Sequence, residues 1–363
     1  MQVIIGVLFH FIGGFASGSF YIPYKKVKGW AWESYWIIGG LFSWLIVPPI
    51  AAYLTIPAFG DIIKEAGAGT LGITYLFGVL WGIGGLTYGL GVRYLGVSLG
   101  SSIILGLCMV FGALIPSIYY DAFPVEGKDT FSMMISSTWG LVVLAGLVVC
   151  ILGIIICGKA GMMKEKQIQN TVGKDVHGIE VNSEYKFGLG IIVSIVSGIL
   201  SACFNFGLEA GKPMATVAND LYIMENQSAG SFLFRNNVVY VVLLWGGLTT
   251  NFIWCMILNA RNKTFGDYTN SRTPLFSNYV FAALAGTTWF LQFFFYGMGE
   301  SKLGNGASSW ILHMAFIILV ANMWGLVLKE WKGVNKKTTA TIFAGIITII
   351  ISVLLVGYGN SLK

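Results

Sequence analysis

The charged residues of this 363-residue chain are confined to short segments between long uncharged ones. Ten stretches contain no Asp, Glu, Lys or Arg, and all 22 basic and 16 acidic residues fall outside them. A membrane-spanning helix needs about 20 mostly apolar residues, because a charge at the bilayer centre is costly. The sequence therefore predicts ten transmembrane helices at 1–24, 34–60, 66–92, 97–120, 136–158, 187–208, 236–260, 273–299, 303–328 and 338–362.

The amino-acid composition is typical of a protein embedded in a lipid bilayer, which is therefore an expected partner. Charged residues make up 10% of the chain, against about 25% in soluble domains, and hydrophobic residues make up 56%. The net charge of +6 forms no basic stripe, so nucleic acid is not expected as a partner. The cysteines lack metal-ligand spacing and are interpreted as small buried hydrophobes, with no metal site predicted.

The distribution of Lys and Arg predicts the orientation. Sixteen of the 22 basic residues lie in alternate connections, those after the first, third, fifth, seventh and ninth stretches. Basic residues gather on the cytoplasmic side of a membrane. We therefore expect both termini to face outward, in the inner (cytoplasmic) membrane of a bacterial cell.

The two halves of the chain repeat a pattern. Trp81 is followed by Tyr88, and Trp289 by Tyr296, with Gly, Gly, Leu, Gly and Ser at equal offsets from each tryptophan. Five spans per half make the second half inverted in the membrane, as in secondary transporters with a midplane site. The predicted fold is all-α: a five-helix repeat at 1–158, a cytoplasmic linker at 159–186 and a second repeat at 187–363.

Only two side chains within the predicted spans titrate near neutral pH, namely His10 and His313. They are therefore the candidates for proton coupling. His10 shares a helical face with small and polar residues including Ser17, which favours an inward position. Glu33 and Glu300 stand at span ends, where a carboxylate in a water-filled vestibule is the alternative carrier.

Amide and aromatic side chains predict a solute site. A buried amide such as that of Gln292 needs a partner, which a helix neighbour or a ligand hydroxyl can supply. Sugars bind such amides together with aromatic faces. The candidate substrate-binding residues are Ser17, Trp81, Tyr88, Trp289, Gln292, Tyr296 and Trp310.

Further residues are candidates for a gating ion pair or for anchors at the membrane interface. Arg93 follows the third span and is a candidate for a gating ion pair with Glu33 or Glu330 on the same side. The tryptophans around the first connection are interpreted as interface anchors, a common position for this residue. They are Trp30, Trp32 and Trp36. No nucleophile, acid or metal set appears within the spans, so an enzyme is not predicted.

Several long motifs resemble the L-rhamnose–proton symporter family of the drug/metabolite transporter superfamily. They include Phe20-Tyr21-x-Pro23-x-Lys25-Lys26-Val27-Lys28-x-Trp30, Trp81-Gly82-Ile83-Gly84 through Tyr88-Gly89-Leu90, Trp289-x-Leu291-Gln292-Phe293-Phe294-Phe295-Tyr296 and Ser309-Trp310-x-Leu312-His313-Met314. The resemblance covers nearly the whole chain. It implies a ten-helix inverted-repeat fold and import of L-rhamnose, or a related deoxysugar, with protons and without an organic cofactor.

Two regions depart from the family's pattern. Glu300 stands near an expected His, and Asn305 to Ser308 replaces an Asp-Tyr pair; the connection at 209–236 also differs. These departures leave a different sugar and Na⁺ coupling open. The sequence thus predicts a secondary active transporter, with a metabolite exporter or a membrane sugar sensor or channel as alternatives.

Overall fold

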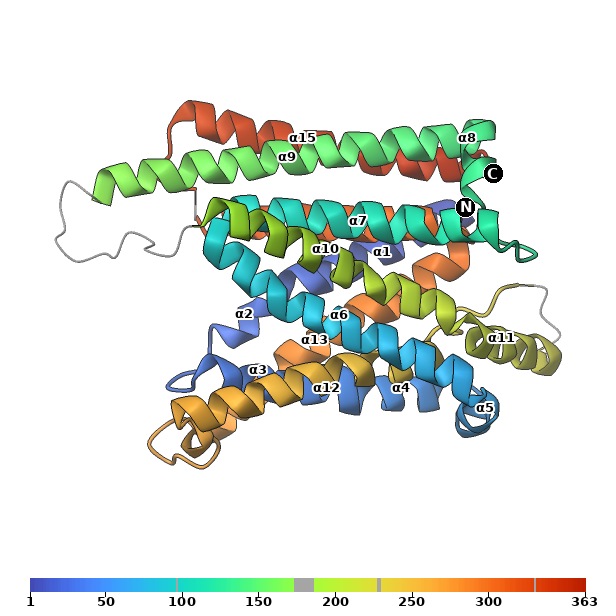
Figure 1. Cartoon of the computed structure of the whole chain (residues 1–363), viewed down its shortest axis with the longest axis horizontal. Coiled ribbons are helices and arrows are strands. Elements are labelled where there is room, and N and C mark those ends of the chain that lie inside the picture. The colour runs from blue at the N-terminus through green and yellow to red at the C-terminus, as the bar shows by residue number, and fades with distance from the viewer. Residues whose placement is uncertain (96, 173–185, 227–229, 330) are drawn as a thin grey trace. The chain divides into compact units, whose positions relative to one another are not determined.

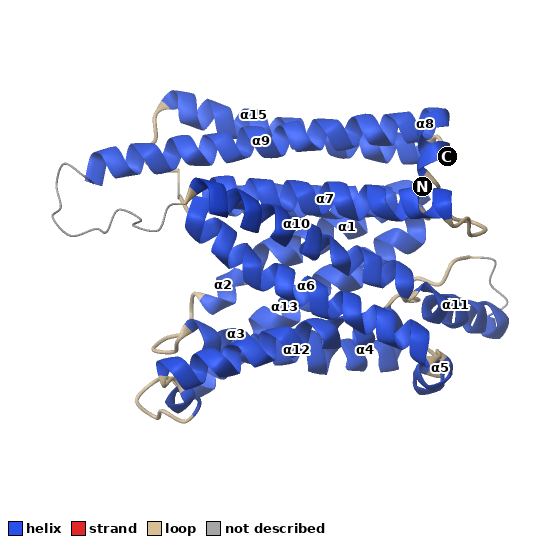
Figure 2. Cartoon of the chain, in the orientation of Figure 1, coloured by secondary structure: helices blue, strands red, loops and turns tan. Residues whose placement is uncertain are grey.

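The structure is a computed structural model that describes residues 1–95, 97–172, 186–226, 230–329 and 331–363. Within these ranges every regular element is a helix, and no strand is present (Figure 2). In hydrocarbon the backbone has no water to bond, so a helix is the one open-ended element that pairs its N–H and C=O groups internally. The predicted all-α class is therefore confirmed.

Ten helical segments in the described part of the chain are long and apolar enough to cross a membrane, as predicted. Two of them are composite. The first joins α1 (Gln2–Ser19) and α2 (Tyr21–Tyr24), and the second joins α3 (Trp32–Gly40), the π-helical turn η1 (Leu41–Ile46) and α4 (Val47–Thr55). The others are α6 (Ala68–Leu95), α7 (Val97–Ala122), α9 (Thr138–Val172), α10 (Phe187–Ala210), α12 (Asn237–Asn262), α13 (Leu275–Leu303), α14 (Gly306–Val327) and α15 (Lys336–Ser361).

Shorter helices lie in the connections. They are α5 (Phe59–Glu65), α8 (Phe131–Ser136), α11 (Lys212–Asn226) and the 3₁₀ turn η2 (Phe265–Tyr268). Four of the described helices begin with a side-chain cap that accepts a hydrogen bond from a first-turn N–H: Thr130 for α8, Ser137 for α9, Asn305 for α14 and Asn335 for α15. Gly304 ends α13 in the left-handed region, at a φ of 65°.

Several helices continue past the charges at which the predicted spans stop. Helix α13 includes Glu300 and Lys302, and α6 includes Arg93. Helix α9 runs on to Val172, into the predicted linker, whose residues 173–185 lie outside the described part. Backbone hydrogen bonding does not stop at a charge, so the absence of charge predicts where a span lies better than where its helix ends.

The chain divides into two compact units. The first unit comprises residues 1–83 and 203–304, and the second comprises residues 84–202 and 305–363. Each unit therefore combines segments from both halves of the sequence, and helices α6 and α10 each contribute to both units.

In the first unit, α1 packs along α13, and α12 packs against α3, η1 and α4. Glycines allow the close approaches. A Cβ on Gly286 of α13 would stand 2.0 Å from the carbonyl oxygen of Gly39 in α3, and one on Gly6 of α1 would stand 2.8 Å from Leu303. Small residues at helix contacts are typical of membrane packing, because they let backbones approach.

In the second unit, α9 and α15 form the most extensive contact, and they lie side by side in Figure 1. Glycines from both helices line this contact. A Cβ on Gly146 would meet Val356, one on Gly153 would meet Ile349, and one on Gly345 would meet Cys157. Helix α7 packs against α14 in the same unit.

These contacts pair spans by their position in the two halves. The second span (α3 to α4) contacts the seventh (α12), the fourth (α7) contacts the ninth (α14), and the fifth (α9) contacts the tenth (α15). In these three pairs, each span packs on the one that occupies the corresponding place in the other half, whereas the first span (α1) packs on the eighth (α13).

We expect Gly153→Leu to lower the free energy of unfolding by about 1–3 kcal/mol, the usual cost of overpacking. A Cβ there would lie 2.6 Å from the Ile349 side chain and 3.1 Å from its backbone nitrogen. Thermal unfolding in detergent measures the effect. Gly106→Leu in α7 is the matched control, because a Cβ at Gly106 meets nothing within 4 Å. Equal stability of the two variants would contradict the packing role of Gly153.

Candidate functional site

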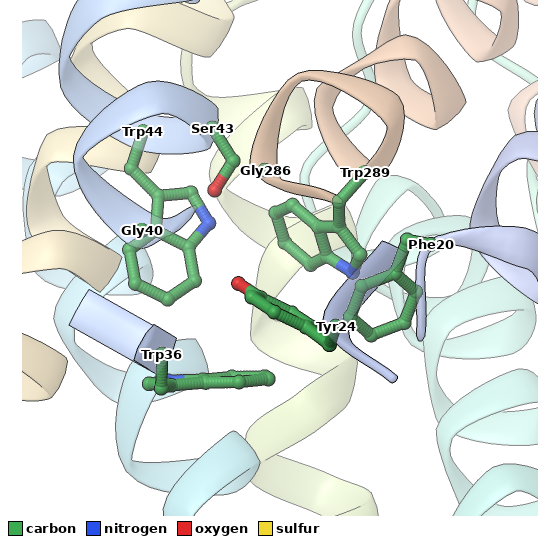
Figure 3. A pocket seen from close by; sticks show the side chains of 8 residues that line it. All are labelled: Phe20, Tyr24, Trp36, Gly40, Ser43, Trp44, Gly286 and Trp289. Atoms are coloured by element: carbon green, nitrogen blue, oxygen red, sulfur yellow. The ribbon is translucent and has the colours of Figure 1, made fainter. Parts of the chain in front are cut away.

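An aromatic hollow lies within the first unit, with an empty volume of about 200 Å³ that includes some open solvent (Figure 3). Its walls come from α2, α3, η1 and α13, together with Phe20, which follows α1. The lining residues are Phe20, Tyr24, Trp36, Gly40, Ser43, Trp44, Gly286 and Trp289.

Polar atoms face this hollow from between the rings. In Figure 3 the hydroxyl oxygens of Tyr24 and Ser43 point toward its centre. The indole nitrogen of Trp44 is buried and has no hydrogen-bond partner. Buried polar groups in proteins are nearly always paired, so this free donor indicates a place for a ligand or water oxygen.

Local backbone features place these side chains. The turn η1 carries Ser43 and Trp44, and it precedes Pro48, which cannot donate a helical hydrogen bond. Such π-helical turns occur frequently at functional sites. A Cβ on Gly40 would stand 2.5 Å from the Trp44 ring, so glycine is what lets this ring lie against the helix.

Further aromatic contacts hold the walls of the hollow in place. Trp289 stacks on Trp81 with centroids 5.6 Å apart, and Trp44 meets Trp289 edge to face at the same separation. The two tryptophans that begin the repeated sequence pattern are therefore in contact. Trp81 supports the wall without lining the hollow, whereas Trp289 does line it.

Trp36 is held by a hydrogen bond within the unit. Its indole N–H donates to Asn251 Oδ1 at 3.1 Å, and the amide nitrogen of Asn251 donates to the Gly247 carbonyl. Trp30 is buried against Tyr268 and Tyr279. Trp36 is half-buried, and Trp32 is exposed and stacks on Trp36. The interpretation of these tryptophans as interface anchors stays a prediction.

A buried stripe on α13 leads away from the hollow. Gln292, Tyr296 and Glu300 follow Trp289 at spacings of three, seven and eleven residues, which places them on one helical face. All three are at least 95% buried. The Gln292 amide nitrogen has no hydrogen-bond partner, and the Tyr296 hydroxyl donates to Asn205 Oδ1 at 3.4 Å.

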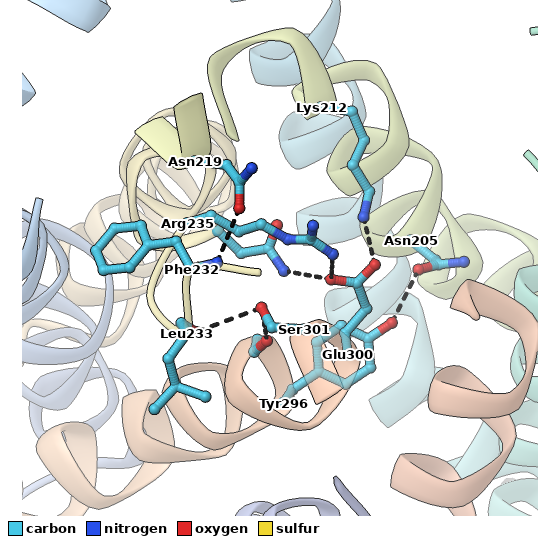
Figure 4. Close-up of polar contacts among 11 residues, drawn as sticks. Asn205, Lys212, Asn219, Phe232, Leu233, Arg235, Tyr296, Glu300 and Ser301 are labelled. Atoms are coloured by element: carbon cyan, nitrogen blue, oxygen red, sulfur yellow. Dashed lines mark hydrogen bonds and ion pairs between the residues drawn. The ribbon is translucent and has the colours of Figure 1, made fainter. Parts of the chain in front are cut away.

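Glu300 ends this stripe in a cluster of ions (Figure 4). Lys212 Nζ lies 2.5 Å from Oε1, and Arg235 Nη2 lies 2.9 Å from Oε2. The amide of Asn236 also donates to Oε2 at 2.9 Å. Glu300 stands in the last turn of α13, which continues to Leu303 beyond the predicted end of the span, and its carboxylate is buried.

The two candidate histidines lie in different units. His10 of α1 is fully buried in the first unit, with its ring 5.3 Å from the Tyr296 ring, edge to face. A Cβ on Gly299 would stand 2.7 Å from its Nε2 atom, so the imidazole lies against α13 one residue before Glu300. His313 of α14 is buried in the second unit, 6.5 Å from the Trp310 ring.

The other predicted site residues are also distributed over the two units. Ser17 is buried in α1 of the first unit. In the second unit, the Tyr88 hydroxyl donates to Ser101 Oγ at 2.7 Å, and the Trp310 indole donates to the Cys108 carbonyl at 3.1 Å. The hollow thus gathers one predicted residue, Trp289, while Trp81, Gln292, Tyr296 and His10 lie behind or beside it on the same unit.

Glu33 has neutral partners. Its carboxylate accepts hydrogen bonds from Asn262 at 3.0 Å and from Thr264 at 2.8 Å, and these fasten α3 to the segment after α12. Arg93 belongs to the second unit and Glu330 lies outside the described residues, so the gating ion pair stays a prediction. Nearby, burial raises the pKa of the Tyr268 phenol above its ordinary value.

Sequence reasoning missed most of the hollow. Phe20, Tyr24, Ser43 and Trp44 were not predicted as site residues, although Phe20 and Tyr24 stand in or beside the first long motif. Aromatic residues are abundant in this chain, at 15%, so their number marks no site. The Pro48-Pro49 pair that follows the π-helical turn was the local sequence signal available for Ser43 and Trp44.

Ten helices long and apolar enough to cross a membrane, with a small, partly polar aromatic hollow in the first unit, are consistent with a membrane transporter. The chain matches the family described as L-rhamnose-proton symport protein (RhaT) over residues 1–362. The chain belongs to this family. It is therefore a transporter of the symporter class and not an enzyme.

Proteins named L-rhamnose-proton symporter are similar to this chain along nearly its whole length. Those of Yersinia pestis (strain Pestoides F) and Yersinia pseudotuberculosis serotype O:1b (strain IP 31758) are each 36% identical to it over 362 residues, 98% of both chains. That of Yersinia pestis bv. Antiqua (strain Antiqua) is 35% identical over the same length.

We expect Gln292→Leu to leave the free energy of unfolding unchanged or to raise it by about 1 kcal/mol. A buried amide without a partner costs stability, and leucine of similar volume removes that cost. Thermal unfolding in detergent measures it. Asn251→Leu is the control: its amide makes two hydrogen bonds, so its loss should destabilise by about 1–3 kcal/mol. A loss of stability in Gln292→Leu equal to that of Asn251→Leu would contradict the assignment of Gln292 as an unpaired group.

Proposed function

We propose that this chain imports L-rhamnose, or a closely related deoxysugar, together with protons by alternating access. One observation carries the proposal: a chain of the symporter family holds a small aromatic hollow into which hydroxyl groups and an unpaired indole N–H point. The relatives' names supply the sugar and the ion.

The chemistry of the hollow suits a deoxysugar. A pyranose ring presents C–H groups that pack on aromatic faces, which Trp36, Trp44 and Trp289 can offer. L-rhamnose also carries a methyl group, which favours an apolar wall. Its hydroxyls would bond Tyr24, Ser43 and the Trp44 nitrogen, and satisfy the donor that is otherwise unpaired.

The pairing of equivalent spans supports the proposed inverted repeat. A two-fold relation between halves 1–158 and 187–363 would bring equivalent spans together, as α7 with α14 and α9 with α15. It also brings equivalent residues near the axis together, as Trp81 with Trp289. Inverted repeats of this kind support alternating access.

Ten apolar helices make this a multi-pass membrane protein. We place it in the bacterial inner membrane with both termini outside, as the distribution of basic residues indicates. In this orientation the Leu303 end of α13 and the connection that contains α11 face outward. His10, His313 and the carboxylates remain proposed carriers of the coupling proton.

We expect purified protein in proteoliposomes to accumulate radiolabelled L-rhamnose when an inward proton gradient is imposed, with external alkalinisation that tracks sugar entry. Protein-free liposomes are the control. Uptake driven by a Na⁺ gradient with no pH change would show that the coupling ion is Na⁺ and not the proton. Equilibration of the sugar without accumulation would indicate a channel. Absence of L-rhamnose uptake in any gradient would contradict the substrate.

We expect Trp289→Ala to raise the KM for sugar uptake by about 3- to 10-fold, because one aromatic wall contributes about 0.5–1.5 kcal/mol beyond its area. The maximal rate should fall less than the affinity. Trp245→Ala is the matched control, since Trp245 is 40% exposed on α12 of the same unit and does not line the hollow. Equal KM values in the two variants would contradict the assignment of the hollow.

A further inference from the structure

The ion cluster around Glu300 carries more positive than negative charge. Lys212 and Arg235 both pair with this one carboxylate, which is only 4% exposed (Figure 4). Taking the Glu300 carboxylate out of water is costly, and removing one member of such a cluster leaves the others uncompensated. A chain that needs only a tight helix contact would be served as well by apolar side chains, so the cluster calls for a functional account.

The helices that pack around the Glu300 carboxylate carry other titratable groups. Tyr240 of α12 and Tyr296 of α13 interact electrostatically with Glu300, and Glu209 of α10 interacts with Tyr296. His10 of α1 lies against Gly299, and Lys302 follows two residues later on α13. Among these groups, Glu300 is the one that two described cations hold directly.

The cluster is incompletely hydrogen-bonded. Three of its buried atoms have no partner, namely Arg235 Nε, Asn236 Oδ1 and the Tyr240 hydroxyl. A polar network that satisfies every member fixes one arrangement, whereas a partly satisfied network is less strongly committed to it. These three free atoms stand beside Glu300, so a second arrangement of the same groups has donors and acceptors available.

The cations belong to elements other than α13. Lys212 begins α11, and Arg235 stands just before α12, whose first residue Asn237 also donates to Thr55 of α4 at 2.9 Å. A second contact joins α11 to the same segment, from the Phe232 N–H to Asn219. Glu300 therefore holds α11 and the start of α12 against the end of α13.

Helix α13 also links this cluster to the aromatic hollow. Trp289 and Glu300 are eleven residues apart on one face, which corresponds to about 16 Å of rigid helix. A movement of α13 on closing around a sugar would therefore be transmitted to the ion pairs at its end. No other described acidic side chain makes ion pairs on this helix.

We propose that Glu300 is the group that couples proton binding to sugar transport, and that its protonation releases Lys212 and Arg235. This inference rests on the proposed function. A proton from water adds to one carboxylate oxygen, the carboxylate becomes a neutral acid and both ion pairs are lost, so α11 and the start of α12 separate from α13. Release of the proton restores the ion pairs. In the proposed orientation the cluster faces outward, where the proton enters.

Two assays in proteoliposomes separate coupling from transport. Accumulation against a gradient needs proton movement, whereas exchange of labelled for unlabelled sugar needs only the loaded carrier. We expect Glu300→Gln to exchange L-rhamnose within about twofold of the wild-type rate while its accumulation ratio falls to about 1. Lys302→Gln removes a charge from the same helix end and should accumulate sugar normally.

The outcomes decide between assignments. Wild-type accumulation by Glu300→Gln would overturn the proposal, and a loss of accumulation in His10→Gln at the same time would return the coupling role to that histidine. Failure of the wild-type protein to transport L-rhamnose would contradict the proposed function instead.

A second variant tests the coupling role of Glu300 if Glu300→Gln does not fold. Lys212→Gln removes one cation that competes with the proton for Glu300, so the pH dependence of accumulation should shift to higher pH. An unchanged pH profile in a folded Lys212→Gln protein would overturn the proposal.

Discussion

The hydrocarbon core of a bilayer offers no partner to a backbone N–H or C=O group, and this constraint governs the whole structure. Each span must be helical, and each charge must lie near a helix end or be paired. Glu300 obeys the second rule, since its buried carboxylate has two cations and an amide around it. The interior position that makes this group costly also makes its protonation consequential for the helices that it joins.

Uncharged helices must be held together by close packing of complementary surfaces, because lipid competes equally for apolar side chains. Glycines supply that fit where Gly286 meets Gly39 and where Gly153 meets Ile349. The close approach of α3 and α13 at Gly286 also brings Tyr24, Trp36 and Trp289 around one hollow. The same glycine thus serves both helix packing and the formation of the site.

The sequence predicted the ten spans because a charge is a strong local signal that needs no knowledge of neighbours. It predicted Trp289 through a repeated pattern, and the contact of Trp289 with Trp81 gives that repeat a physical meaning. The hollow was harder to predict, since Trp44 and Tyr24 meet only through tertiary packing and a π-helical turn. The predicted span ended before Glu300, whose cations come from segments some 65 and 88 residues away.

In a symporter, binding of the sugar and binding of the proton must favour the same conformation. Helix α13 carries a candidate group for each ligand, Trp289 for the sugar and Glu300 for the proton. The most direct test is the proton count on sugar binding, measured with a pH indicator in weakly buffered detergent solution of purified protein. The account predicts uptake of up to about one proton for each L-rhamnose bound, and none in Glu300→Gln. Sugar binding without proton uptake by the wild-type protein, across the pH range in which it transports, would contradict the account.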